Sequence, residues 1–338
     1  MVLVNMKLKE LLRYRNIWIG CAMMWIMLAH SGFDFSSKLF GYLKMWGYGG
    51  VDICLFASGI GCYFSLEKDS DGLRFLKRRV IRLAPAYLCF LPLWMAYRIA
   101  VSNLPLQAAL GNVVGVQSFT GLGNSFSWYI SALLLIYLLA PYLKSLADRV
   151  NGMRRQLLVV GVLIVLSIPF WGVHNLIITV TRLPVFYIGM LLAKACRQDK
   201  QLEKRDLAVC LFLLLAGIGF LCGAYRFFPD QLWSHGLHWY PFLFITPGLC
   251  VLISLAFSAL ERVKWFGWIS NLINLIGKNS FELYLVHVFL YEELISELGI
   301  SDISGNQNLF WLGTVPVVVL GCWILKFAAG AVRKATAK

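Results

Sequence analysis

Four ionisable side chains, His30, Asp52, Arg182 and His287, lie inside long apolar runs of this chain. Such groups are costly in a membrane and usually face the interior of a helix bundle. A neutral imidazole at His30 can accept a proton from a hydroxyl. A carboxylate at Asp52 can hold one imidazole nitrogen and thereby orient the other. The residues also allow simpler roles, a histidine hydrogen-bonded between helices and an aspartate that caps the second helix at its outer end.

His287 is a second candidate base, with Tyr284 one helical turn before it. It could equally be a packed polar residue. Arg182 opens a later apolar run, where it either snorkels to the membrane surface or holds an anionic or glycan acceptor. No two histidines stand four residues apart with a carboxylate nearby, so no metal site is predicted. His235 and His238 are expected to face solvent in an outer loop.

A basic cluster precedes the third apolar run, from Lys77 to Tyr87. Arg79 and Arg82 are three residues apart, so on a helix they share a face, and Arg78 adds a third guanidinium. Guanidinium groups at a membrane boundary can bind phosphate through paired hydrogen bonds. The alternative is a cluster that only sets the orientation of the neighbouring spans.

Composition indicates the element that must position these residues, a membrane-spanning helix. Hydrophobic residues make up 59% of the 338 and charged residues 14%, with a formal net charge of +14. A soluble domain is less apolar and carries about twice that charged fraction. The cations fall between apolar runs, as in cytoplasmic loops, which argues against nucleic-acid binding. The nine cysteines contain no Cys-x-x-Cys pair and are predicted to pack as small membrane residues.

The apolar runs predict an all-α, polytopic helix bundle with about ten transmembrane helices, each needing about 20 apolar residues. The expected spans are 17–35, 47–66, 83–101, 127–146, 156–173, 178–194, 207–225, 238–259, 279–297 and 309–329. Cations alternate with uncharged or acidic loops, which predicts cytoplasmic termini. The whole chain, 1–338, is expected to be one integral membrane domain with no appended soluble domain. Residues 265–276 predict an interfacial amphipathic helix, and Asn279 with Glu282 has the spacing of a capping box.

Taken in order, several short patterns resemble the acyltransferase-3 family of bacterial inner-membrane acyltransferases. The residues that carry the resemblance are His30, the run Gly49 to Gly59 with Asp52, Arg79 and Arg82 with Pro85 and Tyr87, Trp128 with Tyr137 and Pro141, Arg182 with Pro184 and Gly189, and Ser280 with Tyr284 and His287. The chain departs from the family pattern at Ile19, where the family often has a cation and where the nearest one here is Arg15. It departs again at Leu133 and Leu134, where many members carry glutamate.

The resemblance implies transfer of an acyl group from cytoplasmic acyl-CoA, often acetyl-CoA, to a hydroxyl of a surface polysaccharide or its lipid-linked precursor. His30, Asp52 and His287 would then be catalytic. Arg78, Arg79, Arg82 and Tyr87 would bind the acyl-CoA, and Trp128, Arg182 and Tyr284 the acceptor. The implied setting is the bacterial cytoplasmic membrane, with membrane lipids, the glycan acceptor and in some cases a periplasmic protein as partners.

The competing interpretation is a carrier, either a lipid-linked glycan flippase or a small-molecule transporter. It would also use about ten spans, interior charges and basic loops. Transporters often contain repeated, broken spans, and no internal repeat is evident in this chain. The sequence therefore favours the transferase over the carrier.

Overall fold

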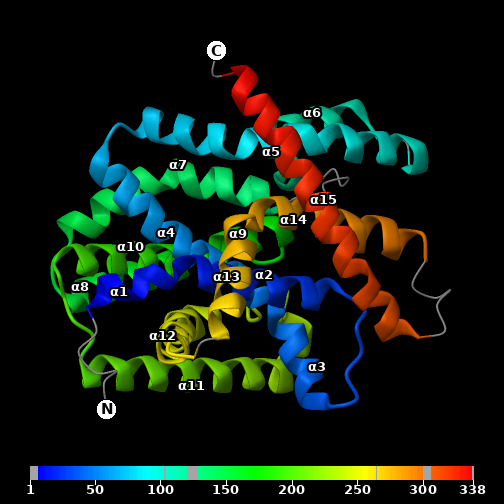
Figure 1. Cartoon of the computed structure of the whole chain (residues 1–338). Coiled ribbons are helices and arrows are strands. Elements are labelled where there is room, and N and C mark those ends of the chain that lie inside the picture. Colours follow the sequence, from blue (N-terminus) through cyan, green and yellow to red (C-terminus); the bar gives the residue numbers. More distant parts are fainter. Residues whose placement is uncertain (1–6, 103, 121–127, 264, 300–305, 337–338) are drawn as a thin grey trace. The chain divides into compact units, whose positions relative to one another are not determined.

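The computed structural model describes residues 7–102, 104–120, 128–263, 265–299 and 306–336 (Figure 1). These residues form helices and contain no named strand, only one isolated bridge between Lys7 and Gln201. The all-α prediction is confirmed. The chain forms two compact units, which we call unit 1 (Met1–Ala22, Gly49–Phe75 and Ile136–Gly277) and unit 2 (Met23–Tyr48, Leu76–Leu135 and Lys278–Lys338). The prediction of a single domain stays a prediction.

Unit 1 contains the helices that pack around α4 and α10. Its elements are α1 (Leu8–Leu11), η1 (Leu12–Tyr14), the first half of α2 (Arg15–His30), α4 (Gly50–Lys68), the second half of α7 (Trp128–Arg149), α8 (Met153–Val165), η4 (Ile168–Phe170), α9 (His174–Val180), α10 (Leu183–Arg197), α11 (Lys204–Phe227), η5 (Pro229–Gln231), α12 (Phe242–Leu260) and nearly all of α13 (Phe266–Lys278). Helix α12 contacts α11, and Figure 1 shows α12 nearly end-on beside it, so the two cross steeply.

Unit 2 contains the C-terminal helices and the second half of α2. Its other elements are α3 (Lys38–Met45), most of η2 (Trp46–Gly49), nearly all of α5 (Gly72–Ser102), α6 (Leu106–Val114), η3 (Gln117–Phe119), the first half of α7, α14 (Ser280–Val288), the π-helix η6 (Phe289–Ile295) and α15 (Gln307–Thr336). Helices α14 and α15 pack together. They run in opposite directions, because Gly321 lies against Val286 whereas Thr314 reaches Tyr291.

Eight helical segments of the described residues are long and apolar enough to cross a membrane. They correspond to all the predicted spans except the first and the ninth. Helix α2 alone has 16 residues and α14 alone has 9, but α2 follows η1 directly and α14 continues into η6, so helical backbone runs without a break over 8–30 and 280–297. A multi-pass membrane protein is therefore supported, and the count of about ten and the side of the termini stay predictions. The two short helices are those that carry His30 and His287.

Helix α2 ends at His30, five residues before the end of the predicted span. The chain leaves the helix at Ser31 and passes close to α15, where a Cβ on Gly32 would lie 2.5 Å from the Trp311 indole nitrogen. Residues 265–276 form most of α13, as expected for an interfacial helix, with Trp265 and Trp268 exposed. The predicted capping box is wrong, because Asn279 at the N-cap of α14 makes no side-chain cap hydrogen bond.

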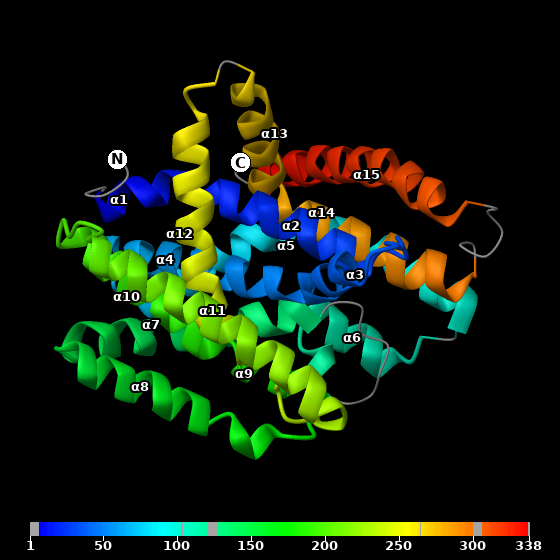
Figure 2. The same ribbon diagram turned by 90° about the horizontal axis from the view of Figure 1, so that it is seen from below.

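The core of unit 1 is the contact between α4 and α10 (Figures 1 and 2). Two glycines allow the backbones to meet. A Cβ on Gly59 would lie 2.1 Å from the Phe186 carbonyl oxygen, and one on Gly189 would lie 2.2 Å from the Phe56 carbonyl oxygen. Small residues at such a contact give close van der Waals packing where apolar lipid provides no hydrophobic drive between helices.

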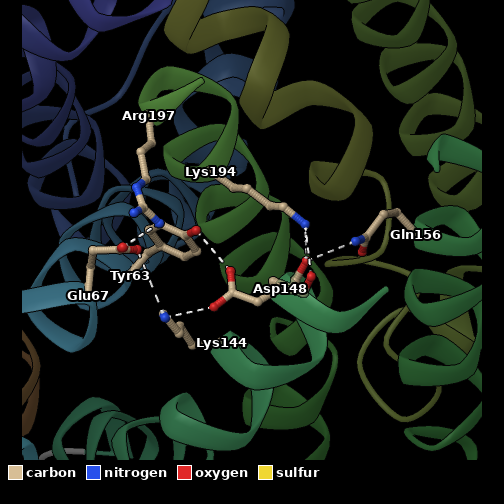
Figure 3. A network of polar contacts seen from close by, with 8 residues as sticks. Tyr63, Glu67, Lys144, Asp148, Gln156, Lys194 and Arg197 are labelled. Carbon is tan, nitrogen blue, oxygen red and sulfur yellow. Dashed lines mark hydrogen bonds and ion pairs between the residues drawn. The ribbon is translucent and has the colours of Figure 1, made fainter. Parts of the chain in front are cut away.

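The C-terminal ends of α4 and α10 are joined to α7 and α8 by a polar network (Figure 3). The Tyr63 hydroxyl donates to Asp148 at 2.9 Å, and Lys144 pairs with Asp148 at 2.7 Å. Arg197 pairs with Glu67. Lys194 donates to the Ala147 carbonyl at 2.7 Å, which satisfies a carbonyl in the last turn of α7. Gln156 of α8 donates to the same carbonyl at 3.1 Å. Charge-assisted hydrogen bonds therefore hold the ends of α4, α7 and α10 together, and Gln156 attaches α8 to them.

We predict that Gly189→Ala destabilises the protein, because the new methyl group would collide with backbone on α4 that cannot rotate away. Overpacking of this kind costs about 1–3 kcal/mol. Gly219→Ala on α11 is the matched control, since nothing lies within 4 Å of its Cβ position. It should be neutral or stabilising by about 0.5–1 kcal/mol. Thermal unfolding in detergent measures both, and equal melting temperatures for the two variants would contradict the close contact.

Candidate functional site

Unit 2 brings the two predicted bases, His30 and His287, together. His30 is the last residue of α2, and His287 lies near the end of α14. His287 Nε2 lies 3.3 Å from His30 Nδ1, within hydrogen-bond distance, and His287 Nδ1 lies 2.7 Å from the Leu283 carbonyl oxygen. His287 is fully buried and the His30 side chain is 10% exposed. The two histidines therefore form one site, although the sequence presented them as alternatives.

Aromatic residues surround this pair within unit 2. The Tyr48 ring meets His30 edge-on with centroids 5.1 Å apart, and the Tyr284 ring lies 5.9 Å from His287. Tyr284 contacts Tyr129 at 5.0 Å, and Tyr129 contacts Trp128 at 5.9 Å. The structure thus connects Trp128 and Tyr284, both predicted to bind the acceptor, to the histidines. Binding of the acceptor by these aromatic residues stays a prediction.

Sequence reasoning missed Glu292, which belongs to the π-helix η6. Its Oε1 lies 3.2 Å from His30 Nε2, on the opposite side of the imidazole from His287. In an α-helix a residue five positions after His287 would point about 140° away from it, because each residue turns the helix by about 100°. No α-helical spacing could have connected them, although an acidic residue soon after a buried histidine was a visible signal.

The predicted acyl-CoA cations lie on α5, which runs unbroken through Pro85 and Pro92. Arg79 is half-buried, and Arg78 and Arg82 are exposed. Because α5 is helical here, Arg79 and Arg82 share a face as predicted. The structure adds Arg333 of α15, whose Nη2 donates to the Arg82 backbone carbonyl at 3.1 Å. Sequence reasoning did not single out Arg333.

Tyr87, predicted to contact acyl-CoA, is buried inside unit 2. Its hydroxyl donates to the Asn112 backbone carbonyl at 2.5 Å, and the Asn112 side chain donates to the Ala108 carbonyl at 2.8 Å. The tyrosine therefore joins α5 to α6. Its predicted contact with acyl-CoA stays a prediction, and the contact seen in the structure holds two helices together.

In unit 1, Asp52 and Arg182 form a buried ion pair. Arg182 Nε lies 3.2 Å from Asp52 Oδ2, and each residue is 1% exposed. Arg182 also donates to the Ile178 carbonyl at 2.8 Å and lies over the Trp239 ring at 5.4 Å. Asp52 sits in the first turn of α4, where the helix dipole favours a carboxylate. The expected roles, orienting His30 for Asp52 and holding an acceptor for Arg182, stay predictions, because His30 belongs to the other unit.

The expectation that His238 faces solvent is wrong. His238 is fully buried, stacks on Trp233 with centroids 4.6 Å apart, and hydrogen-bonds to the Tyr225 hydroxyl at 2.7 Å through Nδ1. The loop before α12 folds back onto the unit because its aromatic side chains provide enough apolar surface to bury the imidazole. Among the described residues, no group of three or more histidines, cysteines or carboxylates is placed to hold a metal ion.

These contacts separate two chemistries. The Asp52–Arg182 pair in unit 1 is electrostatically satisfied, because each charge already has an opposite charge beside it. The group in unit 2 combines two imidazoles with a carboxylate whose side chain is 52% exposed, so protons can be exchanged there with a bound hydroxyl or with water. General base catalysis is therefore assigned to the unit 2 group, because its imidazoles have no opposite charge bound as closely as Arg182 is to Asp52.

We predict that Arg182→Gln strongly destabilises the protein, because it leaves the Asp52 carboxylate buried without a counter-ion. Breaking a buried pair on one side costs about 3–5 kcal/mol. The double variant Asp52→Asn, Arg182→Gln should recover part of that loss. Lys9→Gln, which removes an exposed partner of Asp199, should have no measurable effect in the same thermal unfolding assay. Additive losses in the double variant would show that the two side chains do not interact.

Comparison with known proteins agrees with the residue patterns. The profile of a protein family described as an acyltransferase domain matches residues 18–327, most of the chain. No curated protein and no solved structure matches the chain. The matched segment includes both histidines, Glu292, and the arginines of α5.

Proposed function

The chain belongs to the acyltransferase-3 family, and from that premise we propose that it is a membrane O-acyltransferase with His30 as its catalytic base. The donor would be cytoplasmic acyl-CoA, with acetyl-CoA the simplest case. The acceptor would be a hydroxyl of a surface polysaccharide or of its lipid-linked precursor, in a bacterial cytoplasmic membrane. The observation that carries the proposal is the buried histidine pair, because an imidazole whose Nδ1 is hydrogen-bonded to a neighbouring ring has a defined lone pair on Nε2 with which to accept a proton.

The reaction needs such a base. An alcohol is a poor nucleophile near neutral pH unless its proton is removed during attack. His30 would take that proton while the hydroxyl oxygen bonds to the thioester carbonyl carbon. The carbon–sulfur bond then breaks, and the thiolate of CoA leaves and takes up a proton. Trp128 and Tyr284, which lie beyond the histidines, would contact a sugar ring by stacking.

The cations of α5 would hold the donor. CoA carries several phosphate groups, and guanidinium groups bind phosphate through two parallel hydrogen bonds. Arg79 and Arg82 share a face, and Arg333 lies beside Arg82. Positive charge from two helices is therefore concentrated at one place in unit 2. A periplasmic partner that completes delivery to the glycan is compatible with this arrangement.

We predict that His30→Gln abolishes most transfer while leaving CoA binding intact. Glutamine keeps a polar contact but cannot accept a proton, and general base catalysis contributes about 10²–10⁴-fold. The assay is acyl transfer, or acyl-CoA hydrolysis, by purified protein in detergent. His235→Gln, outside the site, is the control. Near-normal transfer by His30→Gln together with its loss in His287→Gln would move the base to His287.

We also predict that the double variant Arg79→Lys, Arg82→Lys binds CoA more weakly than the parent. Lysine retains the positive charge and therefore the orientation of the spans, but its ammonium cannot form the paired hydrogen bonds of a guanidinium. Equilibrium binding of CoA, compared with dephospho-CoA, measures the loss. Arg149→Lys, on α7, is the control. Unchanged CoA affinity in the double variant would show that the two arginines only set membrane orientation.

A further inference from the structure

In unit 2, three side chains form a continuous row that starts at a backbone carbonyl. The Leu283 carbonyl oxygen lies 2.7 Å from His287 Nδ1, His287 Nε2 lies 3.3 Å from His30 Nδ1, and His30 Nε2 lies 3.2 Å from Glu292 Oε1. Exposure rises along the row. His287 is fully buried, whereas the side chain of His30 is 10% exposed and that of Glu292 52% exposed.

The partners determine where the hydrogens lie. A carbonyl oxygen only accepts hydrogen bonds, so His287 Nδ1 must carry a hydrogen. Neutral His287 then has its lone pair on Nε2, and His30 Nδ1 must donate to it. Both imidazoles are therefore held with hydrogen on Nδ1, and Nε2 is the basic atom of His30.

The last contact of the row needs one more proton. Nε2 of a neutral His30 presents a lone pair, and an ionised Glu292 presents only lone pairs. The two atoms can form a hydrogen bond only when a proton lies between them. Each of the three contacts in the row then contains one proton. Two of these protons belong to the neutral imidazoles, and the third cancels the charge of the Glu292 carboxylate. The filled row has no net charge, which suits a site of low polarity.

The π-helix explains why Glu292 reaches His30. Helix η6 follows α14 directly and has more residues per turn than an α-helix. The wider turn carries Glu292 back towards the side of His287, whereas α-helical geometry would direct it away. Glu293, the next residue, points to a different partner and lies 3.2 Å from Arg98 of α5. Single π-helical turns inside helices occur frequently at functional sites.

We infer that Glu292 is a positioning residue and the exposed end of a one-proton relay through which His30 Nε2 loses and regains its proton. When the third proton leaves through Glu292, His30 Nε2 has a free lone pair. The proton of the acceptor hydroxyl moves to Nε2 as the new carbon–oxygen bond forms. It then passes to Glu292 and leaves to water or to the departing thiolate, which restores the starting state.

The other titratable groups around the relay are few. Tyr48 of η2 faces His30 edge-on, and Glu293 and Glu297 are both paired with Arg98 of α5. Tyr284 and Tyr291 lie edge-on to His287 at 5.9 and 6.0 Å, and the Tyr291 hydroxyl is hydrogen-bonded to the neutral Thr314 of α15 at 3.0 Å. Glu292 is therefore the one carboxylate among the described residues that contacts His30. The reaction that uses the proton rests on the proposed function. The arrangement of hydrogens rests on the contacts alone.

The test compares Glu292→Gln with Glu293→Gln, two adjacent residues of the same π-helix. We expect Glu292→Gln to lower kcat by up to about 10²-fold, the lower end of what general acid–base catalysis supplies. KM for acyl-CoA should not change. The pH dependence of kcat should change shape, because the group that shares a proton with His30 is gone. Glu293→Gln should leave that profile unaltered, and a profile equally unaltered in Glu292→Gln would overturn the relay.

Nitrogen-15 NMR of histidine-labelled protein provides a test that does not depend on activity. The His30 and His287 signals are identified by their loss in His30→Gln and His287→Gln. We expect His287 to carry hydrogen on Nδ1, and the Nε2 signal of His30 to respond to Glu292→Gln but not to Glu293→Gln. Hydrogen on Nε2 of His287, or an unresponsive His30, would overturn the relay. The expected signals in a protein that transfers no acyl group would support the relay and overturn the proposed function.

Discussion

Unit 1 is built around the close approach of α4 to α10. Gly59 and Gly189 bring the two backbones into contact, and an ion pair lies at each end of the helix pair, Asp52 with Arg182 and Glu67 with Arg197. Because low-numbered residues of one helix meet low-numbered residues of the other, the helices are parallel. The segments that contain α4 and α10 are also the most enclosed of the eight candidate spans, with 72% and 78% of their most apolar stretches buried, against 50% or less for the others.

The two ends of this helix pair differ in polarity for a physical reason. A charge pair without water must be matched closely, because removing ions from water costs several kcal/mol each. Asp52 is matched by direct contact with Arg182, and Arg182 also contacts a backbone carbonyl and an aromatic ring. At the other end, Tyr63, Lys144, Asp148 and Lys194 extend the network over three helices, α4, α7 and α10, and several of its side chains are partly exposed. A parallel pair also agrees with the loop charges, since both helices are even-numbered spans in the predicted order.

The histidine site in unit 2 depends on departures from regular helix geometry. Helix α2 stops at His30, and α14 passes into a π-helix just after His287. Irregular backbone at membrane depth is tolerated where protein or a water-filled cavity surrounds it. The same irregularity places a carboxylate beside a buried imidazole, which regular helices of this sequence would not do.

Much of this protein follows from its amino-acid sequence, because membrane helices are specified by local composition. Apolar runs of about 20 residues predicted all eight long helical segments. The three-residue spacing of Arg79 and Arg82 predicted their shared face, and ionisable residues inside apolar runs indicated the candidate bases His30 and His287. Short patterns in fixed order also indicated the family. Each of these features depends on neighbours within one or two helical turns, and helical periodicity reports them directly.

The pairing of side chains from distant segments depended on tertiary packing. The sequence offered His30 and His287 as alternatives, yet they are partners, and it did not indicate that Asp52 pairs with Arg182. Glu292 escaped notice because a π-helix changes the angular position of every residue after it. His238 appeared to be exposed because polarity was judged without the aromatic loop that covers it. Residues far apart in the chain become neighbours only through helix packing, and no local pattern encodes which of several polar residues will meet.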